Sequence, residues 1–306
     1  MYDIIGDVHG YSTELGLLLE KMGYQKRFGV YHHNTRKAIF LGDFVDRGPD
    51  VKGCLKMVKH MVEEGAAYAV LGNHEYNLVA FFTRGVNGRF LRPHSVKNLR
   101  QVKSSLKAFE DSQKKLQKYL DWFKTLPLFL ELDGLRVIHA TWDKKHISFF
   151  KEQYPKNKLS DELLHKSMEK GTKEHEAIES ILKGVEVPLP KGFTFFDSDG
   201  NERKQLRIKW WESPQGKTFR DLAMREADKI PDVEIPEGFN NGYIDYPETD
   251  PPLFLGHYCL RETEPFLFKK NICCVDFCVV KAGFLTAYRW DGEKELDTAK
   301  FVKVKI

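Results

Sequence analysis

Five short apolar segments of this chain each run directly into side chains that can bind metal ions. The segments read YDIIGDVHG, KAIFLGDFVDRGPD, AAYAVLGNHE, LRVIHATWD and PLFLGHYCL. Each apolar run has the length of a strand that is buried on both faces. Because ligands in α/β sheets gather at the carboxyl ends of the strands, five such ends can converge on one site.

Segments with helical spacing lie between the first of these strands. Residues 12–23 and 51–65 each carry an apolar face and end in glycine, as helices commonly do. Near the end of the chain, NICCVDFCVV, GFLTAYRW and FVKVKI read as consecutive strands joined by turns, so one sheet should be mixed or antiparallel. The expected fold class is α/β, a two-sheet sandwich flanked by helices.

Two long polar stretches, at about residues 80–125 and 144–250, interrupt this scheme. We therefore expect a single domain over residues 1–306 with two helical or loop insertions. The first should contain one long helix over residues 95–126, and the second a helix over residues 161–184. Insertions between ligand-bearing strands usually form the walls of a site, so these should select the substrate.

Composition narrows the choice of partners. A net charge of +4 over 306 residues is far below that of a dedicated nucleic-acid binder. We therefore expect no dedicated binding of nucleic acid. The chain has no apolar run of membrane-spanning length and no room for a signal peptide before Tyr2, so we expect a cytoplasmic protein with no membrane partner. Its five cysteines form no CxxC pair and are expected to be reduced, mostly buried thiols.

The ligands at the strand ends supply oxygen and imidazole nitrogen. They number six: Asp7, His9, Asp43, Asn73, His139 and His257. This is too many for one four-coordinate ion but suits two divalent ions, of which Mn fits best and Fe or Zn are alternatives. Two such ions can activate a water and neutralise an anionic leaving region, which is phosphoryl-transfer chemistry.

The motifs GDVHG (6–10), GDFVDRG (42–48), GNHE (72–75), IHA (138–140) and GHY (256–258) stand in this order. With them the chain resembles the calcineurin-like metallophosphoesterases, and the VDRG sequence resembles their phosphoprotein-phosphatase-like branch, which includes bacterial diadenosine tetraphosphatases. The resemblance implies a hydrolase that uses two metal ions and attack by a metal-bridging hydroxide on phosphate esters or anhydrides.

The resemblance also implies a role for each residue. Asp7 and His9 would hold the first metal, Asp43 would bridge, and Asn73, His139 and His257 would complete the second. His74 would be the general acid, oriented by Asp46, and Arg47 would bind phosphate oxygens. Glu75 would support a ligand. For a second phosphate-binding arginine the best match is Arg220; the rivals are Arg207, Arg225 and Arg261.

The substrate stays open at this point between phosphorylated small molecules, nucleotides and phosphoproteins. A nucleotide-like substrate such as a dinucleoside polyphosphate is favoured, because HA at residues 139–140 replaces the HGG of eukaryotic protein phosphatases. The basic stretch over residues 84–103 would also suit an elongated polyanion. The alternatives are a serine/threonine phosphoprotein phosphatase and a phosphate-binding module without catalysis.

Overall fold

The computed structural model of the chain describes residues 1–196, 202–224, 230–236, 238–239, 242–281 and 283–306. The chain forms two compact units, Met1–Leu182 with Pro251–Ile306 and Lys183–Asp250. The second unit lies within the insertion expected at residues 144–250, and the part of that insertion before Lys183 belongs to the first unit. That all 306 residues act as one domain stays a prediction.

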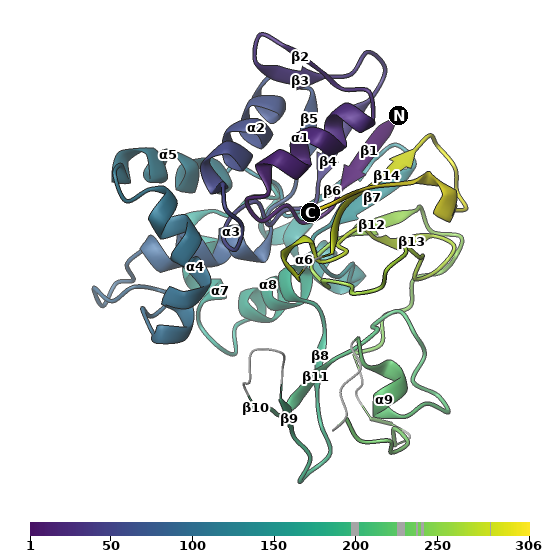
Figure 1. Ribbon diagram of the computed structural model, residues 1–306. Helices are drawn as coiled ribbons and strands as arrows, with labels where there is room; N and C mark the ends of the chain where they lie inside the picture. Colours follow the sequence, from purple (N-terminus) through teal and green to yellow (C-terminus); the bar gives the residue numbers. More distant parts are fainter. Residues whose placement is uncertain (197–201, 225–229, 237, 240–241, 282) are drawn as a thin grey trace. The chain divides into compact units, whose positions relative to one another are not determined.

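The first unit contains a five-stranded sheet in the order β15-β14-β1-β4-β5 (Figure 1). Its strands are β1 (Tyr2–Ile5), β4 (Lys37–Phe40), β5 (Ala67–Ala69), β14 (Phe284–Trp290) and β15 (Phe301–Lys305). Strands β1, β4 and β5 run parallel, whereas β14 pairs antiparallel with both β1 and β15. This sheet is therefore mixed, as GFLTAYRW and FVKVKI predicted, whereas only Ile272–Cys274 of NICCVDFCVV forms a strand, and it lies in the other sheet.

A four-stranded sheet in the order β13-β12-β7-β6 forms the second layer. Its strands are β6 (Phe129–Leu132), β7 (Leu135–Ile138), β12 (Leu253–Leu255) and β13 (Ile272–Cys274). Strands β7, β12 and β13 are parallel, and β6 returns antiparallel to β7. All five apolar segments that precede ligands thus form strands, and each runs parallel to at least one other of the five.

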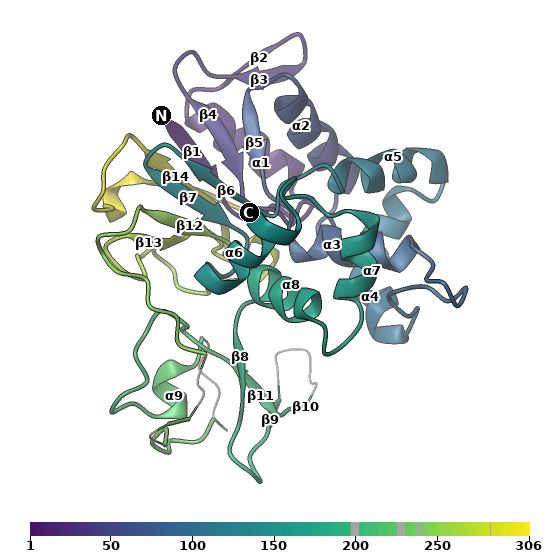
Figure 2. The same cartoon turned by 180° about the vertical axis from the view of Figure 1, so that it is seen from behind.

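The two sheets pack face to face. Ile4 and Ile39 of the first sheet share one buried core with Val137 and Phe254 of the second. On the other face of the first sheet lie α1 (Ser12–Lys21), which contacts β14 and β15, and α2 (Val51–Glu63), which contacts β5 (Figures 1 and 2). The predicted α/β two-sheet sandwich flanked by helices is confirmed.

The single helix predicted over residues 95–126 is wrong, because two helices occupy this stretch. Helix α4 (Val96–Ala108) ends before the buried ring of Phe109, and α5 (Gln113–Phe123) begins after Ser112. The Ser112 side chain accepts the backbone N–H of Lys115. A serine in this position caps a new helix and competes with continuation of the old one.

The helix predicted over residues 161–184 is also two helices, α7 (Asp161–Ser167) and α8 (Lys173–Lys183). Gly171 lies between them with φ +89°, a conformation that a helix does not allow. Thr172 Oγ1 then accepts the N–H of His175 and caps α8. Two further helices, α3 (Asn73–Phe82) and α6 (Lys144–Gln153), were not predicted.

The remaining elements of the first unit are short. They are the hairpin β2 (Gln25–Arg27) and β3 (Val30–His32), and the 3-10 turns η1 (Val279–Lys281) and η2 (Thr298–Lys300). Among the helices of the described residues, none combines the length and the apolar character that crossing a bilayer demands.

The second unit, taken by itself, contains two short antiparallel pairs and one helical turn. These are β8 (Glu186–Pro188) with β11 (Gln205–Arg207), β9 (Phe195–Phe196) with β10 (Glu202–Arg203), and α9 (Phe219–Leu222). Arg203 and Arg207 both donate to the Glu186 carboxylate. Trp210 and Trp211 of this unit are buried.

Candidate functional site

The six predicted metal ligands all follow the carboxyl ends of strands β1, β4, β5, β7 and β12. Within the first unit these ends meet where the two sheets face each other, and the chain turns there in unusual conformations. His9, Asp43 and His257 have positive φ angles of 46°, 53° and 70°. Residues other than glycine adopt this left-handed region at a cost of about 1 kcal/mol or more, and such strain clusters at functional sites.

The carboxylate of Asp43 lies between two groups of possible ligands. Its Oδ2 is 3.7 Å from His9 Nε2, and its Oδ1 is 3.5 Å from His139 Nε2. One group consists of His9, Asp43 and His74, and the other of Asp43, His139 and His257; in each, one ligand atom per residue lies within 4.8 Å of the others. Asp43 is the residue that the two groups share, as a bridging carboxylate requires.

Hydrogen bonds fix which ring nitrogen of His9 and of His139 faces the site. His9 Nδ1 donates to the Val45 carbonyl at 3.0 Å, and His139 Nδ1 donates to the Leu41 carbonyl at 2.7 Å. The Nε2 atoms are thereby left to face Asp43. Orientation of ligating imidazoles by a backbone carbonyl is a common feature of metal sites.

Asn73 joins the second group through its side-chain oxygen. This Oδ1 is 3.0 Å from His139 Nε2 and 2.7 Å from His257 Nδ1. Because Asn73 is the first residue of α3, it comes directly after the Gly72 turn that follows β5. An added Cβ at Gly72 would lie 2.3 Å from Asp43 N and Oδ1, so only glycine lets α3 start this close to the shared carboxylate.

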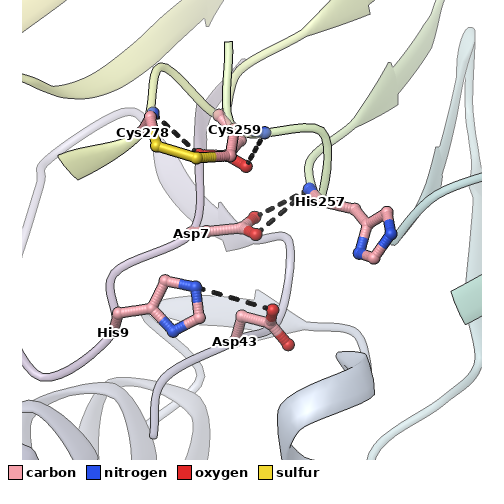
Figure 3. Close-up of a disulfide and its surroundings, with 7 residues drawn as sticks. Asp7, His9, Asp43, His257, Cys259 and Cys278 are labelled. Carbon is pink, nitrogen blue, oxygen red and sulfur yellow. Dashed lines mark hydrogen bonds and ion pairs between the residues drawn. A yellow bond between two sulfur atoms is a disulfide. The ribbon is translucent and has the colours of Figure 1, made fainter. Parts of the chain in front are cut away.

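The Asp7 carboxylate lies beside the second group, where it accepts a hydrogen bond from the backbone N–H of His257. Both Asp7 oxygens accept the N–H of His257, at 3.2 and 3.1 Å, and Figure 3 shows the Asp7 carboxylate between the His257 loop and the His9–Asp43 pair. Asp7 belongs to neither three-residue group of the described residues. Its role as a ligand stays a prediction.

Glu75 holds the loop that carries Asp43 through hydrogen bonds to its backbone. Its buried carboxylate accepts the backbone N–H groups of Asp43 and Phe44, both at 2.7 Å, and of Val45 and Gly72, both at 3.2 Å. Burial raises the pKa of Glu75 to about 7, against the bonds from Phe44 and Asp43, which lower it. One side chain thus holds together the turns after β4 and β5.

His74 and Asp46 form the pair expected of an oriented acid. His74 Nδ1 is 2.6 Å from Asp46 Oδ2, and His74 Nε2 lies 3.9 Å from Asp43 Oδ2 and faces the site. Burial lowers the pKa of His74, but Asp43 and Asp46 outweigh it and the pKa is raised overall. The hydrogen bond from His74 Nδ1 to the Asp46 carboxylate favours the protonated imidazole that a general acid needs.

The two predicted phosphate-binding arginines differ in their surroundings. Arg47 follows Asp46, is exposed and has φ 63°, so its side chain starts beside the acid pair. Arg220 lies in the second unit, where its guanidinium contacts the Ile230 carbonyl and Asp232. Of the rivals, Arg207 pairs with Glu186, Arg261 is exposed, and Arg225 lies outside the described residues.

The site gathers buried carboxyl groups. Five carboxyl groups are at least nine-tenths buried within it: Asp7, Asp43, Asp46, Glu75 and Asp276. Burial, Asp276 and Asp43 together raise the pKa of Asp7 well above its usual value. Buried carboxylates are stable when cations compensate them, so the residues present fit two divalent cations held by oxygen and imidazole ligands.

Asp276 was missed by the sequence analysis, although a signal was present. It follows the apolar strand β13 in ICCVD, just as Asp7 and Asp43 follow theirs. Its carboxylate accepts the N–H groups of Cys259 at 2.5 Å and Cys278 at 3.0 Å. It thereby anchors the loop that carries His257.

Cys259 and Cys278 form a disulfide beside this anchor (Figure 3). The expectation of reduced thiols is wrong for this pair, whose Cα atoms lie only 4.1 Å apart, and holds for the buried, free Cys54, Cys273 and Cys274. Residues 19 positions apart in sequence meet because β12 and β13 are neighbours in the sheet. Cysteine spacing alone does not reveal such a pairing.

Comparison with known proteins places the chain in a family. Residues 2–274 match the family model of the calcineurin-like phosphoesterases. The chain therefore belongs to the calcineurin-like phosphoesterase family, as its five motifs indicated.

Among curated proteins the chain is similar to the bis(5'-nucleosyl)-tetraphosphatase PrpE [asymmetrical] of Oceanobacillus iheyensis, with 38% identity over 139 residues, 45% of this chain and 54% of that protein. The protein of the same name from Bacillus subtilis is 32% identical over 147 residues, 45% of this chain and 57% of that protein. The chain thus spans about half the length of these relatives. A solved structure, the cold-active protein-tyrosine phosphatase of a Shewanella species, aligns with TM-score 0.46 and 15% identity over 94% of this chain and 75% of that one.

Proposed function

We propose that this protein is a metal-dependent phosphoesterase that hydrolyses dinucleoside polyphosphates. The observation that carries the proposal is the position of Asp43, whose two oxygens face two separate ligand groups while His74 presents its Nε2 to the same space. In the proposal, Asp7 and His9 belong to the first ion and Asn73, His139 and His257 to the second. The metal we propose is Mn, with Fe or Zn as alternatives, because the ligands are carboxylate, amide and imidazole.

Bound divalent ions would supply a nucleophilic water and neutralise charge on the phosphoryl group. The protein's own groups would do the rest of the work. Arg47 would hold phosphate oxygens through its planar guanidinium. As the P–O bond breaks, its electron pair would stay on the departing oxygen. His74, oriented by Asp46, would protonate this oxygen from Nε2.

Two observations support an elongated, anionic substrate. The curated relatives bear the name bis(5'-nucleosyl)-tetraphosphatase. In addition, Ser104 of α4 donates to the Arg47 carbonyl, and the exposed Arg100 lies one turn earlier on the same helix. Residues four apart share a helix face, so Arg100 would extend the positive charge of Arg47 along a polyphosphate chain.

The substrate proposal is tested by a panel assayed with Mn at matched concentrations. The panel contains a dinucleoside tetraphosphate, a nucleoside monophosphate, a phosphoserine peptide and phenyl phosphate. We expect the highest kcat/KM for the dinucleoside tetraphosphate, with asymmetric cleavage into a nucleoside triphosphate and monophosphate. A higher value for the phosphopeptide would favour a protein phosphatase instead, and metal binding without turnover of any compound would favour a binding module.

Replacing His74 with Asn should lower kcat for phenyl phosphate about 100-fold or more, because a positioned acid contributes roughly 100- to 10,000-fold. Metal content measured by elemental analysis should stay unchanged, since His74 Nδ1 is bonded to Asp46 and the residue is not one of the six proposed ligands. His165→Asn, at a histidine on α7, is the control and should keep wild-type kcat. Loss of one metal equivalent in His74→Asn would instead make His74 a ligand.

Two further points remain proposals. Arg220 is proposed to bind a second phosphate group, which an increase in KM without a change in kcat in Arg220→Gln would support. The cytoplasm is the proposed location. Because the cytosol keeps most thiols reduced, trapping of free thiols in intact cells would measure whether Cys259 and Cys278 are paired there.

A further inference from the structure

Ser105 of α4 makes two hydrogen bonds to the same residue, Asp46. Its hydroxyl donates to Asp46 Oδ1 at 2.5 Å, and its oxygen accepts the Asp46 N–H at 3.0 Å. Ser105 is only 1% exposed and Asp46 is fully buried. The other oxygen of Asp46, Oδ2, is the one that holds His74 Nδ1.

The loop that carries Asp46 depends on such contacts from outside. Asp46 has φ 66° and the next residue, Arg47, has φ 63°. Two successive residues other than glycine in the left-handed region persist only where the surroundings hold them. The Ser105 hydroxyl holds Asp46 in this conformation, because it bonds both to the backbone N–H and to the carboxylate of Asp46.

A second residue of α4 approaches the same pair. Gln101 lies four positions before Ser105, hence on the same helix face, and its Nε2 is 3.4 Å from His74 Nδ1. Its amide oxygen accepts from Arg92 Nη2 at 2.5 Å, so the amide nitrogen is the end turned to the imidazole. Helix α4 therefore presents a polar face, Gln101 and Ser105, to the acid pair.

We propose that Ser105 is a positioning residue for the general acid: it locks the Asp46 carboxylate so that Asp46 holds His74 Nδ1 and leaves His74 Nε2 directed at the leaving oxygen. The inference rests on the proposed function, in which His74 is the acid. It also gives the insertion at residues 80–125 a part in catalysis, beyond the choice of substrate. Without the Ser105 hydroxyl, the carboxylate can rotate and the imidazole rotates with it.

The first test compares two esters with different leaving groups in Ser105→Ala. Phenol, the leaving group of phenyl phosphate, has a pKa of about 10 like tyrosine, so its oxygen must be protonated by the acid as it departs. 4-Nitrophenolate leaves readily without protonation. We expect kcat to fall about tenfold for phenyl phosphate, the effect of losing one hydrogen bond to a charged group. For 4-nitrophenyl phosphate, kcat should stay within about twofold.

Two variants separate positioning from general damage. Ser105→Thr keeps the hydroxyl and should restore most of the turnover of phenyl phosphate. Ser167→Ala removes another serine hydroxyl that is 1% exposed and hydrogen-bonded, to Tyr76, and should leave the ratio of the two kcat values unchanged. Equal losses on both esters in Ser105→Ala, or no loss on either, would overturn the inference.

The second test needs no turnover. The His74 Nδ1 proton, held by Asp46 at 2.6 Å, should give a far-downfield proton resonance, assigned by its loss in His74→Asn. In Ser105→Ala this resonance should broaden through faster exchange with water, and in Ser105→Thr it should remain. An unchanged resonance in Ser105→Ala would contradict the inference, whether or not the wild-type protein is active. Wild-type protein that hydrolysed neither ester would separately refute the proposed function.

Discussion

Replacing Asp43 with Asn should abolish metal loading and lower the turnover of phosphate esters by about three orders of magnitude. The two Asp43 oxygens lie 3.7 Å from His9 Nε2 and 3.5 Å from His139 Nε2. Asn offers one oxygen, so its NH2 group must face one of the two ions, and the bridging negative charge is lost. The measurement is elemental analysis of the purified variant together with kcat under saturating Mn.

The matched control is Asp121→Asn, which removes the same charge from an exposed position on α5. It should keep both metal content and kcat. His74 N–H also bonds to Asp43 Oδ1, at 2.9 Å, and an amide oxygen can accept this bond, so a folded variant is expected. Asp43→Asn with two metal equivalents and wild-type turnover would show that Asp43 is not the bridge.

Replacing Glu75 with Ala should lower the free energy of unfolding by about 4 kcal/mol, because a buried acceptor of several backbone N–H groups is lost. The four backbone N–H groups that now bond to the Glu75 carboxylate would lose their acceptor, and each unsatisfied donor costs about 1–3 kcal/mol. For a unit of this size, about 4 kcal/mol corresponds to a decrease in Tm of roughly 10 °C. Thermal unfolding of metal-free protein measures this effect apart from any loss of metal.

Glu75→Gln keeps the shape of the side chain but turns an NH2 group toward backbone donors, so its effect should lie between those of wild type and Glu75→Ala. Glu152→Ala, at an exposed position of α6, is the control and should change Tm by no more than about 1 °C, as surface substitutions usually do. If Glu75→Ala unfolded within about 1 kcal/mol of wild type, water would have to replace the carboxylate as acceptor.

The amino-acid order indicated the outlines of the first unit, because buried strands and amphipathic helices leave local patterns. The runs ending at Asp7, Asp43 and Asn73 form parallel strands of one sheet, and those ending at His139 and His257 are parallel in the other. Helices α1 and α2 lie where the apolar spacing predicted them. Family membership followed from the same motifs, since their order along the chain is itself sequence information.

The predicted helices failed where a local competitor interrupted the pattern. Ser112 and Thr172 cap new helices, although the apolar spacing continues across both breaks. Gly171 adds a conformation that no helix accepts. Spacing reports which face can be buried, whereas capping decides where the backbone hydrogen bonds end.

The sequence by itself determined which residue types stand at the strand ends, and hence the family and the chemistry they can support. Only the tertiary structure decided that Asp43 lies between two ligand groups, that Glu75 holds two turns together, that Cys259 meets Cys278, and that Ser105 reaches Asp46. The reason is physical: each of these contacts joins residues on different elements, and the packing of the elements places their side chains within hydrogen-bonding reach. Such distances are set by how sheets and helices meet, and no spacing along the chain encodes them.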